Sequence, residues 1–360
     1  MDRRESLKVL LLGALGARSL SPDELAAAES GSPAHGTAGL ASFRSRWAAW
    51  PNMSWAGPEY WGNRLQDWRV RTGRLVSRTR GPNRTLHCLT HRAEGANFTT
   101  RVHFELDAAA MKGDPAARVG LRFGLQGRFP GVRSAAVHGT GIDAAIDAAG
   151  YLWLGENRSA TAIDVSGPVE LRLRSRAEPG GARVELTGGT LGPTGESLGI
   201  DPPAASHIET LFDATAVLGN LALLSHHPSA SGASGPGSVP ASTPAPAATF
   251  LDWTIDGPDV QATPAAAFGP IWFAQYTLHR GILKLTAQLA PIDGIEGLRV
   301  GLELRRGGGG WTQVATAPVD GLARTAEFRI EGWDAARPAD YRVVANVPLT
   351  TGPETFEYRG

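Results

Sequence analysis

Glu105 and Asp107 are the residues whose types and spacing most directly suggest chemistry. On a β-strand the two carboxylates would face the same side, because side chains two residues apart share a face. Retaining glycoside hydrolysis uses two carboxyl groups about 5–5.5 Å apart, one as nucleophile and one as acid/base. A Glu-x-Asp-x-x-Glu motif would need a third acid at the position that Ala110 holds. We therefore interpret the pair as the solvent-facing acidic end of a strand, and we assign no catalytic residue.

Two glycine motifs match catalytic or cofactor-binding patterns but lack the context that those patterns need. Residues 195–199 are Gly-Glu-Ser-Leu-Gly, and this nucleophile-elbow pattern works only between a buried strand and a helix. Pro202 and Pro203 follow and forbid that helix. Residues 139–144 match the dinucleotide fingerprint Gly-x-Gly-x-x-Ala, which needs a helix after it, but Gly150 and a strand-like run come next. We interpret the first motif as a loop and the second as a glycine-rich turn.

His87, Cys88 and His91 come closest to a metal-binding cluster. The two histidines sit close to strand spacing and could reach one metal ion. The sequence shows no further cluster of metal ligands near them. The other histidine pair, at His226, borders a low-complexity tract. We expect no metal site and no cofactor in this chain. Cys88 is the only cysteine, which excludes an intrachain disulfide and a cysteine-based zinc site.

Three tryptophans, Trp61, Trp68 and Trp153, are candidate binding residues. An exposed indole is an apolar platform on which a sugar ring can stack. Core packing is the commoner fate of tryptophan in strands of this kind. The sequence therefore leaves two roles open for these tryptophans, which are stacking on a glycan and packing in the core.

The composition excludes two classes of partner and favours one fold class. Lys+Arg and Asp+Glu both total 35 in 360 residues, so no global field attracts nucleic acid or an anionic membrane. Only 19% of the residues are charged, while 45 glycines and 25 prolines accompany many short Val/Leu/Thr runs. Such a chain favours strands and turns over helices. We expect an all-β protein with room for two domains.

A β-hairpin over residues 67–77 is the clearest local element. Trp68 and Val70 alternate with arginines, and a Thr-Gly pair supplies a tight turn before the return strand. A second Asp-Trp strand begins at Asp252. We predict that these are the first and last strands of one antiparallel jelly-roll sandwich over residues 42–260, in which alternation puts one face of each sheet on a core.

Many strand-like runs lie between these two elements and favour a jelly roll over a seven-stranded immunoglobulin domain. One of them is predicted at 134–137, whereas the segment 208–212 is either a strand or a helix. The tract 228–248 is rich in Ser, Ala, Gly and Pro and cannot bury apolar surface. A strand precedes it and the second Asp-Trp strand follows it. We therefore predict a disordered loop within the jelly roll, a cheap insertion because loop-closure entropy grows only slowly with length.

The remaining residues, 264–360, carry a second series of strands. Seven strand-like runs over this length predict an immunoglobulin/fibronectin-III-like sandwich. Tyr341 opens the sixth of them, where a tyrosine corner would be.

The N-terminus has the features of an export signal. Arg3 and Arg4 precede Leu-Lys and a short apolar run, a twin-arginine-like pattern, and the run is too short to span a bilayer. Residues 1–28 are predicted to be the signal peptide, ending at a small-residue cleavage site, and 29–41 to be disordered. The expected location is the periplasm or the extracellular space, with no membrane contact after the signal is removed.

Several motifs together resemble a known family. They are Glu59–Arg64, Asp67–Trp68, Gly73–Leu75, Gly219–Leu223 and Phe250–Trp253. They look like a concanavalin/laminin-G-like jelly roll, and with the signal and the second sandwich the layout resembles the N-terminal region of secreted alkaline phosphatase D-like phosphodiesterases. In that family a β-sandwich precedes a calcium- and iron-dependent catalytic domain. The metal-binding motifs of that domain are absent, so no catalytic residue is carried over.

Three hypotheses follow from the sequence. The first is an exported, non-catalytic accessory region of an alkaline phosphatase D-like phosphodiesterase, whose partners are a phosphorylated substrate or a C-terminal phosphatase domain. The alternatives are a carbohydrate-binding module with a glycan ligand, and a degenerate jelly-roll glycosidase that uses Glu105 and Asp107.

Overall fold

The computed structural model describes residues 41–62, 64–129, 131–192, 206–228, 248–292 and 294–360. The described chain is built of antiparallel sheets, which confirms the all-β prediction. No helix in these ranges is long and apolar enough to cross a membrane. Arg3 and Arg4, the Gly-x-Ser-x-Gly motif, and the predicted disordered segments except Ala41, Pro228 and Ala248 lie outside the described residues.

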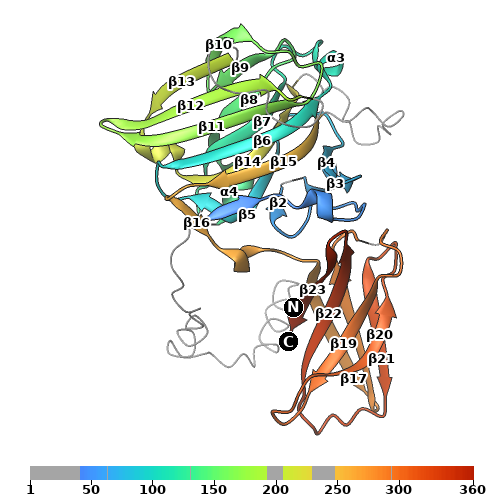
Figure 1. Cartoon of the computed structure of the whole chain (residues 1–360). Helices are drawn as coiled ribbons and strands as arrows, with labels where there is room; N and C mark the ends of the chain where they lie inside the picture. Colours follow the sequence, from blue (N-terminus) through green and yellow to red (C-terminus); the bar gives the residue numbers. More distant parts are fainter. Residues whose placement is uncertain (1–40, 63, 130, 193–205, 229–247, 293) are drawn as a thin grey trace, which may run out of the picture. The chain divides into compact units, whose positions relative to one another are not determined.

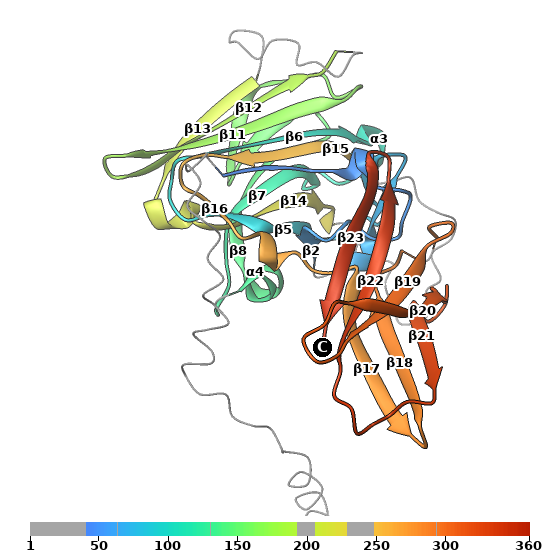
Figure 2. The same ribbon diagram turned by 60° about the horizontal axis from the view of Figure 1, so that its bottom comes forward.

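Two eight-stranded sheets, sheet A and sheet B, stack face to face in the first sandwich (Figures 1 and 2). The strands of sheet A, in spatial order, are β13 (Ser206–Phe212), β12 (Gly181–Thr190), β11 (Val169–Glu178), β6 (Phe98–Leu106), β15 (Ala248–Asp256), β4 (Arg74–Ser77) and β3 (Trp68–Arg71), and β1 (Ser42–Arg44) pairs with β15. The strands of sheet B are β10 (Asn157–Ala162), β9 (Tyr151–Leu154), β8 (Thr140–Ile146), β7 (Arg118–Gln126), β14 (Gly219–His226), β5 (Arg84–Ala93) and β16 (Val260–Ala262), and β2 (Tyr60–Trp61) pairs with β5. The undecided segment 208–212 is thus part of strand β13.

Strands after residue 270 form the second sandwich, a three-stranded and a four-stranded sheet. The first holds β17 (Ile271–His279), β18 (Ile282–Leu289) and β21 (Thr325–Glu331), and the second holds β20 (Thr312–Pro318), β19 (Arg299–Arg305), β22 (Asp340–Leu349) and β23 (Gly352–Arg359). These are the seven strands that the sequence predicts. The boundaries of the two domains stay a prediction.

Short helical turns connect the strands. They are η1 (Trp47–Ala49), η2 (Leu65–Asp67), α3 (Ala108–Met111), α4 (Val132–His138), η3 (Ala214–Val217) and η5 (Pro264–Ala266). The prediction of a strand at 134–137 is wrong, because this segment is part of helix α4. Alanines favour the helix, and Ala135 packs against Leu125 and Ala222 outside the main core.

The core of the first sandwich comes from strict alternation. On β6, Val102 and Phe104 are fully buried between the sheets, while His103 and Glu105 point away from them. Trp253 of β15 is also fully buried and donates from Nε1 to Thr100 Oγ1 at 2.9 Å. The apolar faces of sheets A and B thus bury one another, as in other two-sheet sandwiches.

The predicted hairpin is confirmed. Strands β3 and β4 pair from Trp68 with Ser77 to Arg71 with Arg74, and Thr72 and Gly73 both have positive φ, 46° and 71°, as a type I′ turn requires.

The two Asp-Trp strands belong to one sheet, since β4 lies between β3 and β15. They are not the outermost strands in sequence, because β1 and β2 precede β3, and β16 follows β15. The buried Asp67 joins the two sheets through its ion pair with Arg84 of β5, at 2.7 Å.

Candidate ligand-binding face

The face of sheet B that is turned away from sheet A carries chemically mixed side chains. Val119 and Leu121 of β7 lie in the core, so Arg118 and Arg122 point outward. Directly paired residues on antiparallel strands share a face. One row of such pairs runs from Trp61 through His87, Ala222 and Arg122 to Asp143.

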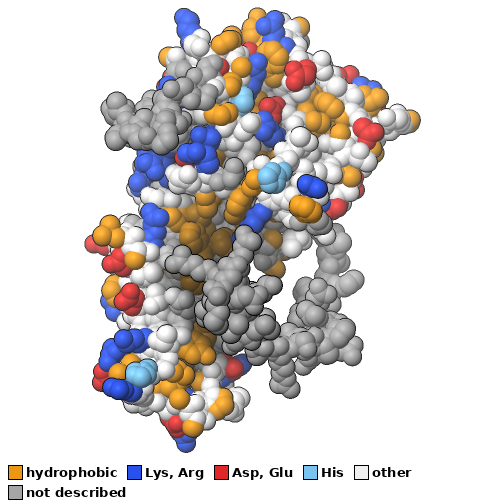
Figure 3. Space-filling model, turned by 180° about the vertical axis from the view of Figure 1, so that it is seen from behind, with side chains coloured by type: hydrophobic (Ala, Val, Ile, Leu, Met, Phe, Trp, Pro, Cys, Tyr) orange, Lys and Arg blue, Asp and Glu red, His pale blue; other side chains and the backbone are white. Residues whose placement is uncertain are grey.

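A second row on the same face includes Ala145, Trp153 and Arg158. We call the side chains gathered there the outer patch: Arg118, Arg122, Asp143, Tyr151, Trp153, Arg158 and His226. Ala145 and Leu224, on the same face, are fully buried and form an apolar floor. Seen from behind, the molecule shows basic, acidic and apolar side chains intermixed on its surface (Figure 3).

Trp153 is fixed in orientation by two contacts. Its Nε1 donates to Asp147 Oδ2 at 2.9 Å, and Arg118 Cζ lies 3.9 Å from the ring centroid. Asp147 is itself held by the backbone N–H groups of Ala149 and Tyr151, at 2.9 and 3.1 Å. The half-buried indole is thus held in one position at the surface of the sheet.

Arg122 and Asp143 form the polar centre of the patch. Arg122 makes a two-point ion pair with Asp143, and Nη2 lies 3.1 Å from Oδ2. Both terminal nitrogens of Arg122 lie 3.2 Å from Asn83 Oδ1, and the Asn83 backbone N–H donates to His226 Nδ1 at 3.1 Å. Burial lowers the pKa of His226, so its ring is neutral near pH 7 and Nε2 carries the remaining donor hydrogen.

His87 lies in the same row of sheet B but is closed off from solvent. Its side chain is fully buried, and neither ring nitrogen has a hydrogen-bond partner in the described part of the chain. Burial, reinforced by the positive charge of Arg122, lowers the pKa of His87 to about 3. The neighbouring Ala222 packs against Ala135 of α4. This helix therefore covers the middle of the row and separates Trp61 from the outer patch.

The three tryptophans proposed as binding residues lie in different environments. Trp153 lies in the outer patch, and Trp61 is half-buried on the same face. Their strands, β9 and β2, lie five strand spacings apart in sheet B, which is about 24 Å along the sheet. Trp68 is only 1% exposed and packs against Phe250 with ring centroids 5.9 Å apart, so it belongs to the core and is not a stacking surface.

The carboxylates proposed for a degenerate glycosidase are each engaged by an arginine. Glu105 Oε1 lies 3.0 Å from Arg74, and Asp107 Oδ2 lies 3.4 Å from Arg80. Their side chains are 40% and 30% exposed, as expected for an acidic strand end. Asp107 follows the last residue of β6, so the two carboxylates do not share one strand face. Two separate ion pairs do not form the acid–nucleophile pair that hydrolysis needs.

The residues considered as metal ligands are not brought together. His87 and His91 both lie on β5, four residues apart, which separates their backbones by about 13 Å. Cys88 points to the opposite face, into the core, and burial raises the pKa of its thiol to about 11. In the described ranges, no group of three or more His, Cys, Asp or Glu side chains is arranged to hold a metal ion.

The prediction of a glycine-rich turn at 139–144 is wrong. Gly139 ends helix α4, and strand β8 begins at Thr140. Asp143 lies in this strand and belongs to the outer patch. The segment therefore contributes to the candidate site through a strand residue and not through its glycines.

Sequence reasoning missed most of the outer patch. Arg118, Arg122, Asp143 and His226 come from three strands that are not all adjacent in the sequence. The alternation of β7 identifies Arg122 as outward-facing. Only the pairing of β7 with β8 brings Arg122 to Asp143, and only its pairing with β14 brings Arg118 to His226.

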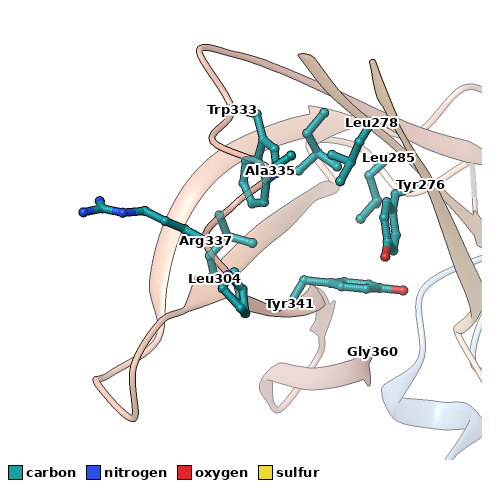
Figure 4. A pocket seen from close by; sticks show the side chains of 12 residues that line it. Tyr276, Leu278, Leu285, Leu304, Trp333, Ala335, Arg337, Tyr341 and Gly360 are labelled. Atoms are coloured by element: carbon teal, nitrogen blue, oxygen red, sulfur yellow. The ribbon is translucent and has the colours of Figure 1, made fainter. Parts of the chain in front are cut away.

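A cavity of about 440 Å³ opens at one end of the second sandwich (Figure 4). It is lined mainly by Tyr276, Leu278, Leu285, Leu304, Trp333 and Tyr341. Arg337 extends away from it (Figure 4), 3.6 Å from Asp334. Small-molecule sites combine apolar walls with a few convergent polar groups, and here no charged group points inward. We therefore do not assign the cavity as the functional site.

No protein-family model matches the sequence, and no curated protein matches it significantly. Among solved structures, the VIP36 exoplasmic/lumenal domain in its Ca2+-bound form is similar with a TM-score of 0.34 and 10% identity, over 62% of this chain and 97% of that chain. Its Ca2+/Man3GlcNAc-bound form gives a TM-score of 0.33 and 9% identity, over 57% and 85%.

Replacing His87 with leucine should make the protein less sensitive to acid. Because the pKa of His87 is about 3 in the folded chain and near 6.5 when unfolded, the unfolded state binds a proton that the folded state does not. The His87 contribution to stability is therefore complete above pH 6.5 and decreases as the pH falls toward 3. We expect His87→Leu to flatten the fall in unfolding free energy between pH 6.5 and 4 by about 1.4 kcal/mol per pH unit.

Denaturant unfolding at several pH values measures this slope. His207→Leu, at an exposed position on β13, is the control. An unchanged slope in His87→Leu would show that the buried imidazole is not the acid-sensitive group.

Proposed function

We propose that this chain is a non-catalytic β-sandwich protein that binds a glycan through the outer patch of sheet B. The observation that carries the proposal is the fixed, half-buried Trp153 beside paired charged groups and above an apolar floor.

The chemistry of the outer patch suits a sugar. One face of a pyranose ring consists largely of C–H groups, which can pack against an indole or phenol ring. Arg118 lies 3.9 Å over Trp153 and Arg158 lies 4.4 Å over Tyr151, so a sugar would stack on either ring by displacing its arginine. The hydroxyl groups at the ring edge need both donors and acceptors. Arg122 supplies donors, Asp143 supplies acceptors and His226 Nε2 supplies a donor. In small-ligand sites, a few precisely placed polar groups beside apolar side chains fix the orientation of the ligand.

Trp153→Ala should weaken glycan binding by about tenfold or more, a loss of about 1.4 kcal/mol. Affinity electrophoresis against soluble mannan, xylan and β-glucan measures the effect. Trp311→Ala is a matched control, because Trp311 also lies under arginines, at 4.7 Å from Arg342 and 4.9 Å from Arg305, but belongs to the second sandwich. Equal losses in both variants, or no binding by the unmodified chain, would contradict the proposal.

We further propose that the protein is exported by the twin-arginine route to the periplasm or beyond. The support is the sequence of its first residues, in which Arg3 and Arg4 precede a short apolar run. Replacing both arginines with lysine should abolish export in a bacterial host that has this translocase, whereas Lys8→Arg should not. Fractionation followed by immunoblotting measures the periplasmic share. Undiminished export of the twin-lysine variant would contradict this route.

We also propose that the chain serves as the accessory region of an alkaline phosphatase D-like phosphodiesterase. The support is the order of the parts, a jelly roll followed by a seven-stranded sandwich, together with the residues that resemble this family. The chain alone should not hydrolyse bis(p-nitrophenyl) phosphate with calcium and iron present, and addition of a phosphatase D domain should supply the activity. Turnover by the chain alone that a chelator abolishes would overturn the accessory role.

A further inference from the structure

We propose that the outer face of the β3–β4 hairpin binds an anion with several phosphate groups, such as an oligophosphate. The ligand would be held by Arg69, Arg71 and Arg78. This site lies on sheet A and does not depend on the glycan proposal for sheet B.

The hairpin concentrates positive charge on one face. Trp68 and Val70 point into the core, so Arg69 and Arg71 share the outer face of β3. Arg71 is directly paired with Arg74 of β4. Like charges in directly opposed positions destabilise a sheet. Glu105 compensates the charge of Arg74, so Arg71 is the member of this pair that keeps no acidic partner among the described residues.

Few acidic groups compensate these arginines. Glu105 is engaged by Arg74, with Oε1 3.0 Å from Nη1. Within the described residues, no carboxylate lies within 4 Å of Arg69, Arg71 or Arg78. The chain as a whole has no net charge, so the positive charge at the hairpin is a local excess.

Arg69 shows the lack of a partner most directly. Its Nε is buried and has no hydrogen-bond acceptor in the described part of the chain. Partial burial, together with the positive charges of Arg78 and Arg71, lowers its pKa below the ordinary arginine value. Arg69 and Arg71 share the outer face of β3, and an anion placed beside them would relieve the repulsion between like charges.

The number of free guanidinium groups points to phosphate. A carboxylate has two oxygens and one charge, and Glu105 already fills that role for Arg74. A phosphate has more acceptor oxygens and, in an oligophosphate, several charges, so it can take bonds from more than one arginine fork at once. Arg69 and Arg71 are half-buried and Arg78 is exposed, so all three are accessible from one side.

Binding of inorganic tripolyphosphate to the full chain tests the site. Isothermal titration calorimetry at low and moderate salt should show binding that weakens with salt, because exposed charges are screened. The triple variant Arg69→Gln, Arg71→Gln, Arg78→Gln should bind about tenfold or more weakly. The matched control is Arg306→Gln, Arg329→Gln, Arg337→Gln, which removes the same charge from exposed positions of the second sandwich. This control should leave the affinity unchanged.

Two further measurements distinguish the alternatives. A triple Arg→Lys variant of the hairpin keeps the charge and the fold but loses the planar forks, so it should also bind more weakly. Polyglutamate, a carboxylate polymer, should bind less tightly than tripolyphosphate. Equal loss in the control triple variant, equal affinity for polyglutamate, or no binding of tripolyphosphate by the natural chain would overturn the proposal. Circular dichroism of each variant verifies that the strands remain folded.

Discussion

The pairing of β15 inside sheet A is the constraint on which the rest of the first sandwich depends. This strand bonds to β6 on one side and to β4 and β1 on the other. It joins segments far apart in the sequence, since Trp253 and its partner Thr100 are 153 residues apart. Closing so long a loop costs entropy, which the burial of Trp253 and its neighbours in the core offsets. Without β15, the β3–β4 hairpin would have no attachment to sheet A.

Strand alternation then determines where chemistry can occur. Once one face of each sheet is committed to the core, every second side chain must point outward. On sheet B this gathers Trp153, Arg122 and Asp143, and on sheet A it gathers Arg69 and Arg71. The two proposed sites are therefore consequences of the same packing, although their side chains differ.

The electrostatics of the two faces are opposite in kind. On sheet B, Arg122 and Asp143 neutralise each other, and Asp147 is engaged by N–H donors from Trp153 and the backbone. Such a face offers balanced donors and acceptors, which suits a neutral, hydroxyl-rich ligand. On the hairpin of sheet A, three arginines have no acidic partner in the described residues, which suits an anion. A net charge of zero for the chain conceals both patterns.

The sequence by itself determined the fold class, the hairpin at 67–77 and the seven strands of the second sandwich, because alternation and turn residues are local signals. It misassigned 134–137, where alanines and packing on Ala222 favour a helix. It also could not separate the buried Trp68 from the half-buried Trp153, since both lie in strands of similar pattern. Only the tertiary structure decided which strands are neighbours, and hence that Arg122 meets Asp143 and Arg118 meets His226. The physical reason is that strand order depends on long-range pairing that no local pattern encodes.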